Sequence, residues 1–147
     1  MGVLVAVLFQ QDVILFSIIG AVFGTVPDLD IHFDRFGLVK HRGIWSHSLM
    51  SSAILSGLCA AAYFFYPRYV PFWTWLVVFS ATWMHTAADS LTHSGTHLFY
   101  PLSEKRFRGL VRYDSLAANG LLIIICAGLT YTLLFPQAIF SLMHDLP

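Results

Sequence analysis

Four long apolar stretches limit what this chain can fold into more than any other feature of its sequence. They cover residues 3–26, 48–66, 71–91 and 116–135, and about 20 apolar residues in a helix cross a hydrocarbon core of roughly 30 Å. Hydrophobic residues make up 57% of the 147 positions and charged residues 11%, so a soluble domain of this size could not hide its apolar surface. The sequence therefore predicts an all-α fold. We expect a single integral-membrane domain over residues 1–147, a polytopic bundle of about four transmembrane helices.

Polar residues interrupt the first stretch. Because Gln10, Gln11 and Asp12 lie inside it, this helix either carries polar groups in the membrane or begins near them. The link between the second and third stretches runs only from Pro67 to Pro71, which predicts that these two helices form an antiparallel hairpin.

Two polar loops, residues 27–47 and 92–114, separate the stretches, and the helix count places both loops on the same side of the membrane. Seven of the eight lysine and arginine residues lie in these loops: Arg35, Lys40, Arg42, Lys105, Arg106, Arg108 and Arg112. Arg68 lies in the hairpin on the other side. By the positive-inside rule, we expect a multi-pass protein of the cell (inner or plasma) membrane, with both loops cytoplasmic and both termini outside.

Composition also restricts the partners. The formal net charge is 0, and no basic patch is interleaved with aromatic residues, which argues against a nucleic-acid partner. We expect the lipid bilayer as the main partner instead. Cys59 and Cys126 lie inside apolar stretches and show no metal-binding spacing, so any metal site must use nitrogen and oxygen ligands.

The first candidate cluster follows the first apolar stretch. Asp28 and Asp30 are one residue apart at the predicted exit of the helix, where two carboxylates can reach one cation. The alternative is a solvated polar turn, because Pro-Asp is common in turns.

The second candidate cluster precedes the second apolar stretch. His41 and His47 bracket Arg42; imidazole is a common ligand of zinc-like ions, and a guanidinium suits phosphate or carboxylate. The alternative is an interfacial loop in which Arg42 meets lipid headgroups and Ser46 or Ser48 caps the helix.

The third candidate cluster ends the third apolar stretch. His85, Asp89, His93 and His97 recur at intervals of four, a spacing that places neighbours on one helix face. Ionisable groups within a membrane segment are costly unless they pair or bind a ligand, which favours His85 and Asp89 as ligands. The alternative is a buried His–Asp hydrogen bond that holds helices together.

All three clusters lie at the same predicted membrane face. Together they offer four to six nitrogen and oxygen ligands without thiolates, which suits zinc or a manganese-like ion and leaves room for two ions.

These clusters resemble the YdjM-like membrane-bound metal-dependent hydrolases. The family patterns Pro-Asp-x-Asp, His-Arg-Gly-x-Thr-His-Ser and His-x-x-x-Asp-x-Leu-Thr-x-x-Gly correspond to the blocks at residues 27–30, 41–48 and 85–95, with Ser46 in place of Thr. The resemblance implies metal-dependent hydrolysis with these ligands or near-ligands: Asp28, Asp30, His41, His47, His85 and Asp89. The His-x-x-x-Asp pattern is also similar to the ligand helix of zinc-dependent phospholipase C and P1-type nucleases.

We therefore expect a membrane-embedded metal-dependent hydrolase, most plausibly a phosphoesterase acting on a lipid or lipid-like substrate at the membrane interface. Its cofactor would be a divalent metal, zinc in preference to manganese or magnesium, as one ion or two. Arg42 would stabilise developing negative charge, and Asp30 or His93 would act as general base.

Two other classes of function fit the same residues. A metal-ion transporter or sensor would use the same ligands to carry or detect an ion, and as a homo-oligomer it could build a polar path across the bilayer. A non-catalytic membrane interaction protein would use the polar cluster only to fix helix packing, and it would tolerate a chelator.

Overall fold

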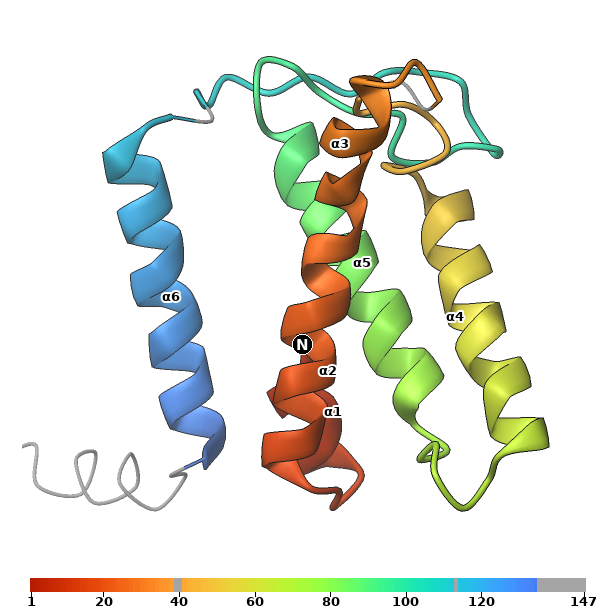
Figure 1. Ribbon diagram of the computed structural model, residues 1–147. Coiled ribbons are helices and arrows are strands. Elements are labelled where there is room, and N and C mark those ends of the chain that lie inside the picture. Colours follow the sequence, from red (N-terminus) through yellow and green to blue (C-terminus); the bar gives the residue numbers. More distant parts are fainter. Residues whose placement is uncertain (39–40, 113, 135–147) are drawn as a thin grey trace, which may run out of the picture.

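The computed structural model describes residues 1–38, 41–112 and 114–134, and these residues form helices and no strands. The elements are α1 (Gly2–Leu8), α2 (Val13–Thr25), the 3-10 helix η1 (Val26–Leu29), α3 (Asp30–Asp34), α4 (Leu49–Phe65), α5 (Thr74–Ser90) and α6 (Leu116–Leu134) (Figure 1). Helices α4, α5 and α6 lie inside three of the four apolar stretches. The all-helical prediction is therefore confirmed.

The first apolar stretch, residues 3–26, forms two helices instead of one. Helix α1 ends at Leu8, and α2 begins at Val13 with Asp12 as its N-cap, whose Oδ1 accepts a hydrogen bond from the backbone N–H of Leu15 at 2.9 Å. The helix thus begins near the polar residues instead of carrying them, because Asp12 is a good capping residue.

Helix α1 folds back along α2. The two backbones approach so closely that a Cβ on Gly2 would lie 1.9 Å from the carbonyl oxygen of Phe16. Only glycine fits there. Met1 consequently lies beside the middle of α2 (Figure 1) and not at the end of the bundle away from the polar loops, where both termini were expected.

Helix α5 is the centre of the bundle and packs against α1, α2 and α4. Helices α4 and α5 form the antiparallel hairpin that the short proline-bounded link predicts (Figure 1). Small side chains allow this close packing: Ser52 and Ser56 of α4 are buried, and Ser56 Oγ donates to the carbonyl of Trp75 at 2.9 Å. Small and hydroxyl-bearing residues are typical of helix interfaces in membranes.

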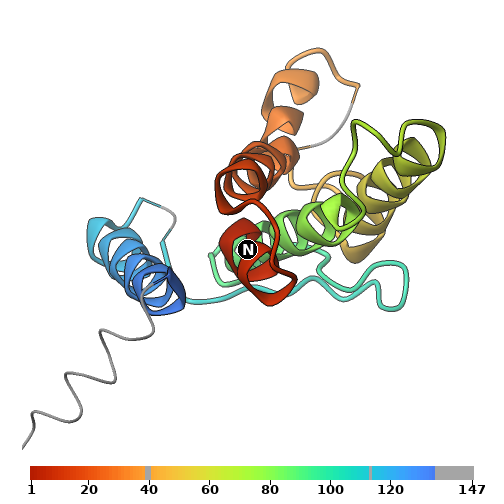
Figure 2. The same ribbon diagram turned by 90° about the horizontal axis from the view of Figure 1, so that it is seen from below.

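Helix α6 stands apart from the other helices (Figures 1 and 2). Among the described residues, its only contacts with another helix are with α1, and its apolar side chains are exposed on several faces, as Leu116, Ile124 and Leu129 illustrate. A helix that is apolar all round fits lipid better than water.

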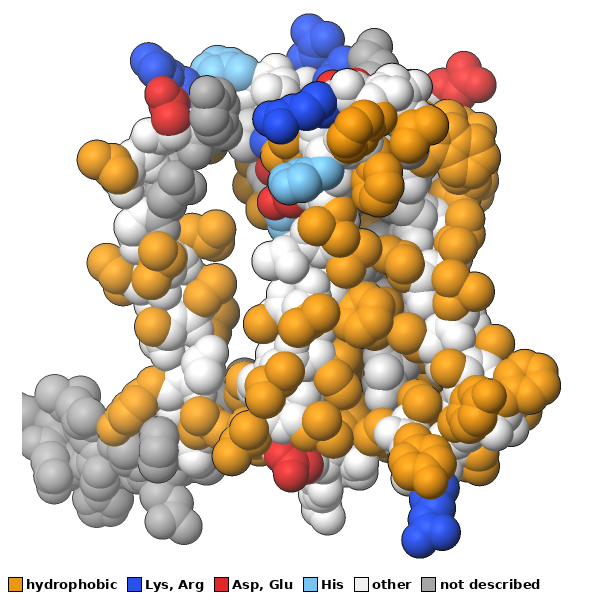
Figure 3. Space-filling view, viewed as in Figure 1, with side chains coloured by type: hydrophobic (Ala, Val, Ile, Leu, Met, Phe, Trp, Pro, Cys, Tyr) orange, Lys and Arg blue, Asp and Glu red, His pale blue; other side chains and the backbone are white. Residues whose placement is uncertain are grey.

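Within the described residues, one continuous helical stretch is long and apolar enough to cross a membrane: Val13–Asp34, with 22 residues. Leu49–Phe65 and Gly120–Thr132 are shorter apolar helices. On the face that Figure 3 shows, hydrophobic side chains cover the helices, and charged side chains gather mainly at the end that carries the polar loops, with an acidic and a basic group at the opposite end.

The two polar loops meet at that end. The Nη1 group of Arg42 donates to Thr92 Oγ1 at 3.1 Å, and the backbone N–H of Leu49 donates to the carbonyl of Leu98 at 2.9 Å. Gly95 allows the second loop to turn, because its φ of +63° lies in the left-handed region and a Cβ there would lie 2.1 Å from the carbonyl oxygen of Phe107. The candidate residues from both loops are thereby brought to one place.

Candidate metal centre

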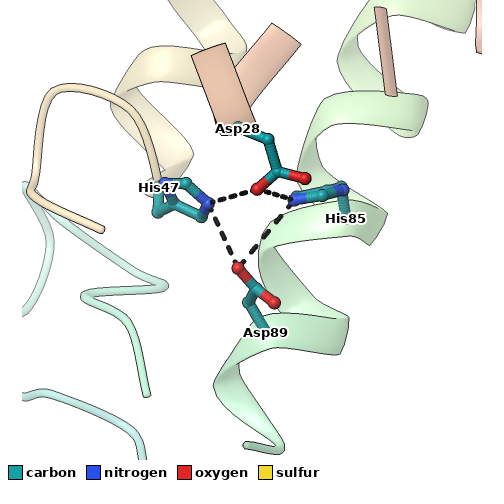
Figure 4. Close-up of side chains that lie close together, drawn as sticks. All are labelled: Asp28, His47, His85 and Asp89. Atoms are coloured by element: carbon teal, nitrogen blue, oxygen red, sulfur yellow. Dashed lines mark ion pairs between the residues drawn. The ribbon is translucent and has the colours of Figure 1, made fainter. Parts of the chain in front are cut away.

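Four side chains from three parts of the chain converge where the loops meet the bundle. They are Asp28 of η1, His47 immediately before α4, and His85 and Asp89 of α5 (Figure 4). Each offers one ligating atom, and all four of these atoms lie within 4.8 Å of one another.

The spacing of the four atoms fits a metal ion. His47 Nε2 lies 3.7 Å from Asp28 Oδ1 and 3.1 Å from Asp89 Oδ2, and His85 Nε2 lies 3.3 Å and 3.8 Å from the same two oxygens. Ligands about 2.0–2.1 Å from a tetrahedral zinc ion would be roughly 3.3 Å apart. The four nitrogen–oxygen separations, from 3.1 to 3.8 Å, lie close to that value.

The hydrogen-bonding state of these atoms supports the same conclusion. In the part of the chain that the structure describes, Nε2 of His47, Nε2 of His85 and Oδ2 of Asp89 are buried and have no hydrogen-bond partner. A buried polar atom without a partner is costly. A bound cation would satisfy all three atoms, so the residues present fit a divalent metal.

Local structure explains how the four residues reach this point. His85 and Asp89 are four residues apart on α5 and therefore share one face. His47 is fully buried, and directly after it α4 begins with a capping box in which Ser48 and Ser51 bond to each other's backbone N–H. Asp28 follows Pro27 in η1, the 3-10 helix that continues α2 into α3.

Asp30 lies beside the centre and supports it. Its side chain is buried; Oδ1 accepts a hydrogen bond from His41 Nδ1 at 2.7 Å, and Oδ2 accepts from Ser46 Oγ at 2.5 Å and from the backbone N–H of Arg42 at 2.8 Å. His47 Nδ1 is 3.0 Å from Ser46 Oγ and 3.2 Å from Asp30 Oδ2. A proton held on Nδ1 leaves Nε2 of His47 free to bind a metal.

Arg42 also acts on the ligands. Its Nη2 group donates to Asp89 Oδ1 at 3.2 Å, which leaves Oδ2 of Asp89 directed at the centre. Its backbone is left-handed, with φ +54°, a conformation that costs of order 1–3 kcal/mol in a non-glycine residue and is common at functional sites. The hydrogen bond from the Arg42 N–H to Asp30 stabilises this conformation.

The structure brings together four of the six predicted metal ligands: Asp28, His47, His85 and Asp89. It places Asp30 and His41 outside the four-atom group, paired with each other. His93, the other predicted general base, is exposed beyond the end of α5, and its backbone N–H donates to the carbonyl of Val111 at 3.1 Å. The described residues contain one group of this kind. A second ion, which the sequence left open, would need a second group, and the described residues do not provide one.

Sequence reasoning missed two contributors. Ser46, considered only as a helix cap, connects His47 to Asp30, while Ser48 is the cap. Thr92 accepts from Arg42 and holds its guanidinium beside Asp89. Thr92 belongs to the Leu-Thr element of the third motif, but only its spatial position reveals the role.

A cavity of about 490 Å³ adjoins the centre. Asp28, Asp89 and Arg42 line one side of it, and Leu121, Leu122 and Ile125 of α6 line the other. Pockets of roughly 300–1,000 Å³ are the usual size for small-molecule ligands.

Fold and site together define an all-helical protein with a membrane-length apolar helix and a histidine–aspartate group that could hold a metal ion. Its sequence matches the family model described as YdjM inner membrane protein over residues 1–143. The chain therefore belongs to the YdjM inner membrane protein family, and the resemblance noted from the motifs is confirmed. No curated protein matches the chain. No solved structure matches it either.

Proposed function

We propose that this protein is a multi-pass, membrane-embedded hydrolase that uses a divalent ion, preferably zinc, to cleave a phosphoester bond in a lipid or lipid-like substrate at the membrane interface. The observation that carries the proposal is the group of four ligating atoms within 4.8 Å of one another. Three of these atoms are buried and lack hydrogen-bond partners among the described residues, and the group opens onto a cavity that Arg42 lines.

An ion bound by these residues would polarise a phosphoryl oxygen and lower the pKa of a water molecule toward neutrality. The chain's own groups prepare the site for that chemistry. Asp30 and Ser46 orient His47, and Arg42 orients Asp89. Because Arg42 also lines the cavity, its charge can stabilise negative charge that develops on the substrate.

A different residue takes the role of general base. Both oxygens of Asp30 accept hydrogen bonds, and His93 lies outside the ligand group. Asp28 has a side chain that is 46% exposed and lines the cavity, so its second carboxylate oxygen can receive a proton from an attacking water molecule.

Helix lengths support four membrane crossings. At about 1.5 Å per residue, the 17 residues of α4 and of α5 and the 19 residues of α6 reach roughly 26–29 Å, close to a hydrocarbon core of about 30 Å. In this proposal α2 makes the first crossing, η1 and α3 lie at its cytoplasmic end, and α1 is a short membrane-embedded segment that packs along α2. Both polar loops lie in the cytoplasm, by the positive-inside rule.

Elemental analysis of the detergent-purified protein tests the proposal, together with hydrolysis of phosphatidic acid and of a water-soluble phosphomonoester. We expect wild type to hold about one equivalent of metal, and His85→Ala and Asp89→Ala each to lose it along with hydrolysis. His97→Ala is the matched control, since His97 Nδ1 bonds to the carbonyl of Glu104 and its side chain is outside the ligand group. Full metal content in all four proteins would mean that His85 and Asp89 only fix helix packing. Metal binding without chelator-sensitive hydrolysis would favour a transporter or sensor.

A further inference from the structure

The cavity beside the metal centre has two chemically different ends. Asp28, Asp89, Arg42 and Arg112 supply its charged lining, here called its polar end. Leu121, Leu122 and Ile125 supply the apolar lining on the α6 side, here called its apolar end, and Leu91 and Val111 add further apolar surface. A single cavity with a charged end and an apolar end matches an amphiphile better than a wholly polar or a wholly apolar ligand.

The cavity is also open toward the side of the molecule. Helix α6 contacts α1 and no other helix of the described chain, and in the space-filling view side chains leave a gap between α6 and the rest of the bundle (Figure 3). The cavity-lining side chains of Leu121, Leu122 and Ile125 remain 59%, 51% and 49% exposed. In a bilayer these side chains are therefore open to lipid.

The charges that line the cavity indicate which kind of ligand fits it. Arg42 and a bound divalent cation would make the polar end attractive to an anion such as a phosphate. Helix α6 contains no charged residue, so the same helix from a second copy of the chain could fill the apolar end but would leave the polar end unmatched. An anionic lipid satisfies both ends at once.

We propose that this cavity binds an anionic lipid that carries a terminal phosphate, with the headgroup at the metal centre and one acyl chain along Leu121, Leu122 and Ile125 of α6. The lipid enters laterally from the bilayer through the gap beside α6. Helix α6 is thus the wall that selects long-chain substrates. This inference rests on the proposed function but adds a binding site that can be tested without turnover.

Photo-crosslinking tests the binding site directly. Full-length protein carries benzoylphenylalanine in place of Leu122, and it is reconstituted in vesicles with alkyne-tagged lipid, either a phosphonate analogue of phosphatidic acid or phosphatidylcholine. We expect the phosphonate to crosslink about 10-fold more than phosphatidylcholine, because its terminal anionic group can make charge-assisted contacts with Arg42 and a bound cation that the zwitterionic headgroup cannot make as well. A chelator should remove this preference. Benzoylphenylalanine in place of Ile123, which is 68% exposed and does not line the cavity, should crosslink both lipids equally.

Equal crosslinking of the two lipids at Leu122 would overturn the inference. A crosslink between two protein copies at Leu122 would also overturn it, and would identify a second copy as the occupant. Selective crosslinking by a protein that hydrolyses nothing would support the lipid site and refute the proposed hydrolase.

A kinetic comparison separates the lipid site from the chemistry. Leu122→Trp should lower kcat/KM for long-chain phosphatidic acid by about 10-fold or more, because the indole occupies the space of the acyl chain, and should leave a water-soluble phosphomonoester unaffected. Ile123→Trp should change neither substrate. Hydrolysis of both substrates at wild-type rates by Leu122→Trp would refute the acyl site and leave the hydrolase proposal intact.

Discussion

Asp30→Asn tests whether Asp30 acts through His47 or binds the ion itself. The substitution keeps the size of the side chain but removes its charge and replaces one acceptor oxygen with a donating NH2 group. In the wild-type protein, Asp30 accepts hydrogen bonds from His41, Ser46 and Arg42, and Nδ1 of His47 lies 3.2 Å from its Oδ2. In the variant at least one of these donors would face another donor, and His47 would lose the charge that keeps a proton on Nδ1.

The four atoms of the ligand group remain in Asp30→Asn, so the expected effect on metal binding is intermediate. Loss of the group that orients a metal-binding histidine typically lowers metal affinity by about 10- to 100-fold, equivalent to roughly 1.4–2.7 kcal/mol. Competition between the purified protein and a chromophoric zinc chelator measures this difference. Asp34→Asn is the matched control, because Asp34 lies on the same short helix, is exposed and is outside the ligand group.

Two results would refute this reasoning. Zinc affinity equal to that of wild type would show that His47 does not depend on Asp30. A loss as complete as in His85→Ala would show that Asp30 is itself a ligand, as the sequence motif implied. The thermal unfolding midpoint of the metal-free proteins, measured in parallel, separates either result from a folding defect.

Three further predictions follow from the geometry. Arg42→Lys should lower phosphoester turnover by about 10- to 1,000-fold because lysine cannot donate to Asp89 and Thr92 with one planar fork; wild-type turnover would remove Arg42 from the mechanism. Cysteines introduced at Arg35 and Arg106 should react with an impermeant maleimide from the cytoplasmic side and one at Arg68 from the other, and opposite labelling of the first two would contradict the shared site. A chelator should lower the thermal unfolding midpoint, and added zinc should restore it, because a ligand that binds only the folded state stabilises it; an unchanged midpoint would argue against a resident ion.

Local sequence patterns determined the helices and part of the site. Apolar stretches of membrane length predicted α4, α5 and α6 nearly to their ends, because helix formation in an apolar stretch depends on residues close together in the chain. The spacing of His85 and Asp89 predicted their shared face for the same reason. The motifs also indicated that Asp28 and His47 would lie near His85 and Asp89. The match to the YdjM inner membrane protein family is consistent with these motifs.

Tertiary structure decided which candidates belong to the four-atom group that could hold a metal ion and which lie beside it. Asp28 and Asp30 look equivalent in sequence, but the chain stays helical from Val13 to Asp34, and side chains two residues apart in a helix point in directions about 160° apart. Asp28 therefore faces His85, whereas Asp30 faces His41. The return of α1 along α2 and the position of α6 beside the cavity were likewise beyond sequence reasoning. Both depend on contacts between segments that are distant in the chain, and the spacing of residues alone does not reveal such contacts.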